Sequence, residues 1–158
     1  MDSQSVKTTE VGGPERGFDS GKRVKGRKRH LLVDTVGLLL VVVVTAASVS
    51  DQAGARDVLQ RLRGTCKKLR KVWVDGTYRG AEWMSWVKEK YRIVLEPVLR
   101  TEEQKGFSVL PRRWVVERTL AWLNQFRRLS KDYEELPTTS ETFIYMAMTR
   151  LMLRRLAA

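Results

Sequence analysis

Residues 27–46 read RKRHLLVDTVGLLLVVVVTA. Two runs, at residues 27–34 and 38–46, flank the triplet TVG at residues 35–37, and this arrangement predicts two strands joined by a turn. Residues 38–44, LLLVVVV, are apolar and rich in β-branched side chains, which is typical of a strand buried on both faces. Seven residues are too few to cross a bilayer, which takes about 20 residues in a helix.

The segments around this hairpin carry strand and helix patterns in alternation. A weak alternation predicts a short strand at residues 2–8, whereas the glycine-rich residues 10–26 predict a flexible loop. The remaining apolar spacing predicts strands at residues 69–74 and 92–98, and helices at residues 51–62, 81–90, 111–128 and 140–156.

Residues typical of helix starts support the last two helices. Pro111 suits the first turn of one helix, and Thr138 with Glu141 forms a T-x-x-E capping box for the other. A hairpin followed by alternating β and α elements predicts one α/β domain over residues 1–158, with a mixed sheet flanked by helices.

Charge indicates the kind of partner. The chain has 158 residues, with 30 Lys and Arg against 18 Asp and Glu, so its formal net charge is +12. This balance predicts a polyanion partner and does not by itself separate DNA, RNA and an anionic membrane surface.

The single cysteine, Cys66, excludes an intramolecular disulfide and a Cys-based zinc finger. The polar first 20 residues exclude a signal peptide.

Three acidic residues stand out against this basic background: Asp2 in DSQSVK, Asp75 in VWVDGTYRG and Glu117 in RWVVERTLAWL. Asp75 ends an apolar strand, and Glu117 lies on a helix rich in Trp and Val, where a charged stripe is typical of a cleft. Carboxylates grouped in a basic chain predict metal-assisted chemistry on a nucleic-acid backbone.

Each acid also has an ordinary structural interpretation. Asp75-Gly76 is a common turn pair, Glu117 can form a solvent-exposed i, i+4 pair with Arg113, and Asp2 can be a disordered terminal residue. The residues alone leave these alternatives open.

Basic side chains are the candidate DNA contacts. Residues 22–29 hold six cations and no acid. This pattern fits contact with the DNA backbone, and it also fits an exposed charged loop. The set expected to contact DNA is Lys22, Arg23, Lys25, Arg27, Lys28, Arg29, Arg113, Arg118, Arg127 and Arg128. Helical spacing predicts that Trp86, Trp114 and Trp122 lie in the core.

Four motifs resemble the DDE insertion-sequence transposases of bacteria, in the branch with a split reading frame. They are DSQSVKTTEVGG at residues 2–13, KRVKGRKRHLLVDTVGLLL at 22–40, VWVDGTYRG at 72–80 and LPRRWVVERTLAWLNQFRRLSKDYE at 110–134. They occur in the family's order and spacing, and the resemblance covers nearly the whole chain.

The resemblance implies an RNase-H-like fold in which Asp2, Asp75 and Glu117 bind two Mg²⁺ or Mn²⁺ ions. It also implies DNA cleavage at transposon ends with water as nucleophile, followed by strand transfer by the freed 3′-hydroxyl. The implied partners are transposon-end and target DNA, further copies of the chain in a DNA complex, and the upstream-frame product. The implied location is the bacterial cytoplasm near the nucleoid, without a membrane.

The chain departs from the family pattern in two ways. Leu110 and Asn124 stand where the family often has an aromatic residue and a lysine, and Arg127 or Arg128 is a candidate replacement for that lysine. Met1 directly precedes Asp2, whereas the family has a strand before the first aspartate, so we expect a downstream frame that lacks this strand. A truncated, non-catalytic DNA-binding inhibitor and a nuclease without strand transfer are the competing hypotheses.

Overall fold

The predicted hairpin forms the centre of the computed structural model. Strands β3 (Val24–Val33) and β4 (Leu39–Ala46) pair antiparallel, from Arg27 opposite Ala46 to Val33 opposite Leu39. The structure describes residues 1–10, 12–63, 65–66, 68–99 and 112–157. The other strands and helices are β1 (Asp2–Lys7), β2 (Gly17–Asp19), α1 (Asp51–Leu62), β5 (Lys71–Val74), η1 (Gly76–Tyr78), α2 (Ala81–Tyr91), β6 (Val94–Pro97), α3 (Arg113–Asn124), η2 (Arg127–Leu129) and α4 (Pro137–Leu156).

The first four strands form one antiparallel sheet with β3 inside it. β1 pairs with one edge of β3, from Asp2 opposite Leu31 to Lys7 opposite Gly26. Gly26 also pairs with Gly17 of β2, so β2 shares the other edge of β3 with β4. The segment 10–26, expected as a flexible loop, therefore contains β2 and the start of β3, and that prediction was wrong for these residues.

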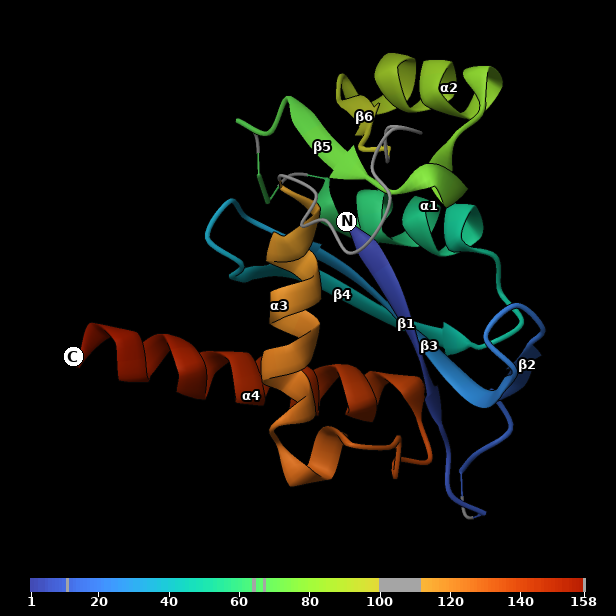
Figure 1. Ribbon diagram of the computed structural model, residues 1–158, viewed down its shortest axis with the longest axis vertical. Helices are drawn as coiled ribbons and strands as arrows, with labels where there is room; N and C mark the ends of the chain where they lie inside the picture. Colours follow the sequence, from blue (N-terminus) through green and yellow to red (C-terminus); the bar gives the residue numbers. More distant parts are fainter. Residues whose placement is uncertain (11, 64, 67, 100–111, 158) are drawn as a thin grey trace, which may run out of the picture.

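The two faces of the hairpin carry separate apolar cores. Val41 and Val43 pack with α1, whereas Val42 and Val44 pack with α3 and α4. This confirms the prediction that β4 is buried on both faces. Figure 1 shows α2, β5 and β6 together at the end of the molecule beyond α1. In the described part of the chain, no helix is long and apolar enough to span a membrane.

The expected single mixed sheet is divided in two. β5 and β6 form a separate parallel pair, from Lys71 opposite Val94 to Val74 opposite Pro97. The Met1 nitrogen donates a hydrogen bond of 2.7 Å to the Trp73 carbonyl, and this contact places the start of β1 beside β5.

Three consecutive basic residues of β3 are buried. Arg27, Lys28 and Arg29 are 0%, 6% and 1% exposed. The prediction that these side chains contact DNA was therefore wrong. β3 is covered on both faces, and alternate side chains of a strand point into one face or the other.

Asp132 is the main partner of Arg27. The Arg27 Nη1–Asp132 Oδ1 distance is 3.2 Å, and both side chains are fully buried. Ser140 of α4 donates its hydroxyl to the same carboxylate, and the Asp132 backbone N–H donates to the Lys7 carbonyl of β1. Asp132 thus joins β3 and the start of α4 through its carboxylate, and β1 through its backbone.

Two helix predictions differ from the structure. The last helix begins at Pro137, with Leu136 as N-cap, so Thr138 and Glu141 do not form a capping box. Proline fits the first turn because its missing N–H has no intrahelical acceptor there. Glu141 instead accepts a 2.9 Å hydrogen bond from the Val44 N–H and pairs with Arg61.

The α3 helix is shorter than expected and rotated. It spans Arg113–Asn124, followed by η2, and Pro111 lies outside the described residues. In the sequence, Val115, Thr119, Trp122 and Phe126 recur at spacings of 4, 3 and 4, which predicts a core stripe along these residues. The buried residues of this region are instead Val116, Thr119, Leu120, Leu123 and Leu129. Trp114, expected in the core, is 39% exposed, while Trp86 and Trp122 are half-buried.

Replacing Arg27 with Met is expected to lower the free energy of unfolding by about 3–5 kcal/mol, because Asp132 then keeps a buried charge without its cation. Lys25→Ala, which removes an exposed cation two residues earlier, is expected to change it by about 0.5 kcal/mol or less. Urea unfolding followed by circular dichroism measures both. Equal, small effects would contradict the structural role of Arg27.

Candidate active site

Asp2 and Asp75 lie at one small hollow. Asp2 is the first residue of β1, and Asp75 follows the last residue of β5. The Met1–Trp73 hydrogen bond aligns the two strands so that these positions are neighbours. The hollow is lined by Met1, Asp2, Trp73, Val74, Asp75, Arg112 and Val116. The structure therefore brings together two of the three predicted acids, from strands that are distant in sequence.

The backbone after β5 fixes the orientation of Asp75. Its side chain caps η1, with Oδ1 accepting a 2.9 Å hydrogen bond from the Thr77 N–H. The Asp-Gly turn expected as an ordinary alternative is thus present. It coexists with the placement of Asp75 at the hollow.

The two carboxylates repel each other. Burial is the main reason that the pKa of Asp2 is raised above its usual value of 3.8, and nearby Asp75 raises it further. The Ser3 N–H, which donates to Asp2 Oδ1 at 2.7 Å, and the cation of Lys22 oppose this change in pKa. A divalent cation between the carboxylates would relieve the repulsion, and carboxylate oxygens suit Mg²⁺ and Mn²⁺.

Glu117 is exposed on α3 beside this hollow. Its neighbour Val116 lines the hollow, and Gln4 Nε2 lies 3.4 Å from Asn124 Oδ1, which ties the end of α3 to β1. Asp2 and Gln4 share one face of β1, and Glu117 and Asn124 are seven residues apart on α3, hence on one helix face. Glu117 therefore lies on the helix stripe that ends over β1.

The convergence of all three acids remains a prediction. Across residues 1–10, 12–63, 65–66, 68–99 and 112–157, no three His, Cys, Asp or Glu side chains are arranged to hold a metal ion. The Asp2–Asp75 pair is the part of the predicted site that the structure assembles.

The remaining predicted DNA contacts occupy different settings. Lys22 is exposed, and its Nζ donates to the Ser3 carbonyl at 3.1 Å, beside Asp2. Arg23 and Lys25 are exposed along a hollow that Lys7 also lines. These three side chains stay candidates for phosphate contact.

The candidates on and after α3 also differ from one another. Arg118 is half-buried, donates to the Val36 carbonyl and lies over the Trp114 ring at 4.3 Å from its centroid. Arg127 is exposed, whereas Arg128 pairs with Glu134 at 2.7 Å. The side chain of Arg113 lies outside the described part of the structure.

Sequence reasoning missed Arg112. It lines the hollow of the acids, and its guanidinium lies 4.6 Å from the Trp73 ring centroid. Its backbone is left-handed, with φ of 72°. The signal was the doubled arginine in PRRW, of which only Arg113 was selected.

Sequence reasoning also missed a buried polar cluster behind Asp2. Ser3 donates to Asp51 at 2.7 Å, and Lys28 pairs with both Asp51 and Asp19 at 3.3 and 3.2 Å. Tyr78 is fully buried nearby, and burial raises its pKa, with Asp51, Asp2 and Asp75 adding to the effect. The signal for Tyr78 was its place in DGTYRG, three residues after Asp75.

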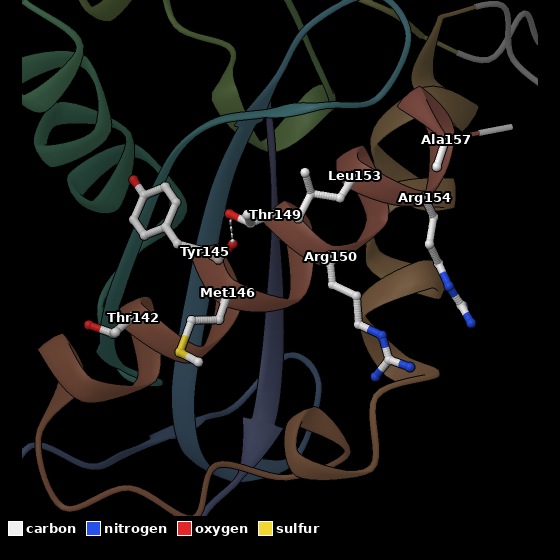
Figure 2. A pocket seen from close by; sticks show the side chains of 8 residues that line it. All are labelled: Thr142, Tyr145, Met146, Thr149, Arg150, Leu153, Arg154 and Ala157. Atoms are coloured by element: carbon white, nitrogen blue, oxygen red, sulfur yellow. Dashed lines mark hydrogen bonds between the residues drawn. The ribbon is translucent and has the colours of Figure 1, made fainter.

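A larger surface hollow lies on the outer face of α4 (Figure 2). It is lined by Thr142, Tyr145, Met146, Thr149, Arg150, Leu153, Arg154 and Ala157. In Figure 2 the side chains of Arg150 and Arg154 extend away from that of Tyr145. Because no carboxylate lines this hollow, it is not the site of the acids.

Comparisons with known proteins place the chain among transposases. The family model described as the transposase DDE domain matches residues 1–152, and the chain belongs to this family. A Burkholderia cepacia protein, named as a transposase for insertion sequence element IS402, is 32% identical over 134 residues. The matched region is 78% of this chain and 61% of that relative, so the chain spans less than two thirds of its length. A comparison with solved structures found no match.

Asp2→Asn is expected to raise the free energy of unfolding at pH 7 by about 0.5–2 kcal/mol, as is common when a strained functional group is relieved. The amide carries no charge to be buried beside Asp75, and its oxygen still accepts from Ser3. The pKa of Asp2 in the folded protein lies above the usual 3.8. The ionised carboxylate therefore destabilises the fold at pH values above this raised pKa, and the destabilisation disappears as the pH falls towards 3.8.

Urea unfolding at pH 7 and near pH 4 measures this difference. Glu82→Gln on α2, an exposed acid remote from the pair, serves as the control, with about 0.5 kcal/mol or less expected. A destabilised Asp2→Asn protein at pH 7 would show that the Asp2 charge is stabilising in the fold.

Proposed function

We propose that this chain carries the catalytic centre of a DDE transposase, which cleaves DNA at insertion-sequence ends and transfers the freed strand. The observation that carries the proposal is the shared hollow of Asp2 and Asp75, with Arg112 as a cation on its wall. Membership of the DDE transposase family and the net charge of +12 support it further.

Asp2, Asp75 and Glu117 would hold two Mg²⁺ or Mn²⁺ ions. The donor set is made of carboxylate oxygens, and a bound cation would offset the burial and the Asp75 charge that together raise the pKa of Asp2. Glu117 would join the pair from the α3 stripe above β1. When bound, two such metal ions stabilise the attacking and leaving oxygens of an in-line displacement.

The protein's own side chains would bind and orient the DNA. Arg112 lines the hollow and lies over the Trp73 ring, and Lys22 donates to the Ser3 carbonyl next to Asp2. Both cations would contact phosphates next to the cleaved bond. Thr77 keeps Asp75 directed by its hydrogen bonds. Phosphoryl transfer depends mainly on such positioning and on charge stabilisation.

The proposed fold is RNase-H-like. The spatial order of the strands supports this fold. β4, β3 and β1 are antiparallel neighbours, β5 lies beside the start of β1, and β6 runs parallel to β5. In this arrangement Asp2 and Asp75 would occupy adjacent central strands.

The proposed reaction has two displacements. Water attacks the phosphorus at the element's end, and the 3′ oxygen leaves with a proton as a 3′-hydroxyl. That hydroxyl then attacks a target phosphodiester, forming one P–O bond as another breaks. The proposed partners are transposon-end and target DNA, further copies of the chain and the upstream-frame product, in the bacterial cytoplasm.

A second candidate is a DNA-binding fragment that inhibits a complete transposase. It is supported by the exposed cations Lys22, Arg23 and Lys25, which would bind DNA whether or not the acids hold a metal ion. Such a fragment would bind element ends and occupy them without cleaving.

Asp75→Asn and Glu117→Gln are each expected to lower divalent-ion-dependent nicking of DNA carrying the element's end by at least roughly 10²-fold, the scale for losing one transition-state-stabilising group. The assay uses Mg²⁺ or Mn²⁺, with chelator as the metal-free arm, and is run on the chain and on its fusion to the upstream-frame product. Glu82→Gln is the matched carboxylate control. Nicking that survives in the Asp75 and Glu117 variants would refute the DDE assignment, and binding without nicking would favour the inhibitor.

A further inference from the structure

A second basic hollow lies where the end of α1, the start of β5 and the turn between α2 and β6 meet. It has a volume of about 210 Å³ and is lined by Leu59, Leu62, Arg63, Cys66, Leu69, Arg70, Lys90, Tyr91, Arg92 and Ile93. Four of these residues are cations, all four are exposed, and none of the lining residues is acidic. The hollow is smaller than the roughly 300–1,000 Å³ of organic-ligand pockets, and its charge suits an anionic group.

The sequence around this hollow is strongly basic. Residues 61–71, RLRGTCKKLRK, hold six cations and no acid. The segment resembles residues 22–29 in composition, but it differs in the exposure of its arginines. Arg63 and Arg92 are exposed, whereas the cations at 27–29 are buried in β3.

The charge of the hollow that is open to an anion comes from Arg63 and Arg92. Within the residues that the structure describes, neither Arg63 nor Arg92 forms an ion pair. Lys90 lies over the rings of Trp86 and Tyr91, at 4.7 and 5.7 Å from their centroids. Arg63 and Arg92 therefore present positive charge to solvent at the hollow.

Arg92 occupies a backbone position that favours glycine. It follows the last residue of α2 as the C-cap, with φ of 56° and ψ of 33°. Helices commonly end with glycine in this left-handed conformation, since a Cβ is crowded there. An arginine at such a position marks a candidate functional residue, because strain of this kind persists where another requirement outweighs it.

We propose that this hollow binds a backbone phosphate of the DNA duplex whose cleavage the acid pair would perform, an inference that rests on the proposed function. β5 runs from the hollow to the acids. Arg70 and Asp75 are five residues apart, or roughly 16 Å along a strand. Phosphates of one DNA strand are spaced by about 3.4 Å along the helix axis. The hollow thus contacts DNA about five nucleotides from the cleaved bond and keeps the neighbouring DNA aligned with the acid pair.

The test compares Arg92→Gly, and Arg92→Gly combined with Arg63→Gln, with Arg150→Gln. The last variant removes one exposed positive charge from α4, away from the hollow. Affinity for duplex DNA carrying the element's end is measured against salt concentration. The slope of log K against log salt is expected to flatten by about 1 for Arg92→Gly and by about the same amount for the double variant, since the hollow binds one phosphate, with no comparable change for Arg150→Gln.

Arg92→Gly also separates binding from folding. Glycine relieves the left-handed backbone, so the melting temperature is expected to stay equal or rise while DNA binding weakens. If Arg92→Gly and Arg150→Gln behave alike on DNA, the inference is overturned. A loss confined to RNA or to anionic phosphatidylserine vesicles overturns it as well. If the unchanged chain does not bind duplex DNA at all, the proposed function itself fails, which is a distinct result.

Discussion

The rest of the structure depends on how three consecutive cations are accommodated inside a sheet. Arg27, Lys28 and Arg29 lie in the central strand β3, where both faces are covered, and a buried charge is costly unless it is paired and hydrogen-bonded. Arg27 forms an ion pair with Asp132, and Lys28 forms ion pairs with Asp19 and Asp51. Arg29 donates hydrogen bonds to the Leu129 and Lys131 carbonyls. These partners lie in three other segments, so pairing the β3 cations fixes the end of β2, the start of α1 and the link into α4.

These same segments position the acid pair. Ser3 and Ser5 of β1 donate to Asp51 and Asp19, the two carboxylates that Lys28 holds, so β1 is secured from the face opposite Asp2. On the Asp2 face, α3 covers the strand and contributes Val116 to the hollow. The strand that carries Asp2 is therefore held on both sides, while its carboxylate stays at the hollow with Asp75.

The sequence predicted the elements whose signals are local, and it failed where partners are distant. The LLLVVVV run sufficed for β4, whereas Asp2 was grouped with Asp75 through the family resemblance. The cluster at residues 22–29 was assigned to DNA because no nearby acid neutralises it, but Arg27 finds Asp132 105 positions away. Residues 61–71 have a similar composition, yet Arg63 and Arg70 from this segment line a surface hollow. Composition does not distinguish the two segments, because burial is decided by topology.

The central claim is that Asp2 and Asp75 form a divalent-cation site, and a crystal soaked in Mn²⁺ tests it most directly. Anomalous diffraction locates manganese independently of catalytic activity. We expect an anomalous peak between the carboxylates of Asp2 and Asp75, and no such peak in an Asp75→Asn crystal. A peak that persists in that variant, or no peak at this hollow in the unchanged chain, would contradict the account.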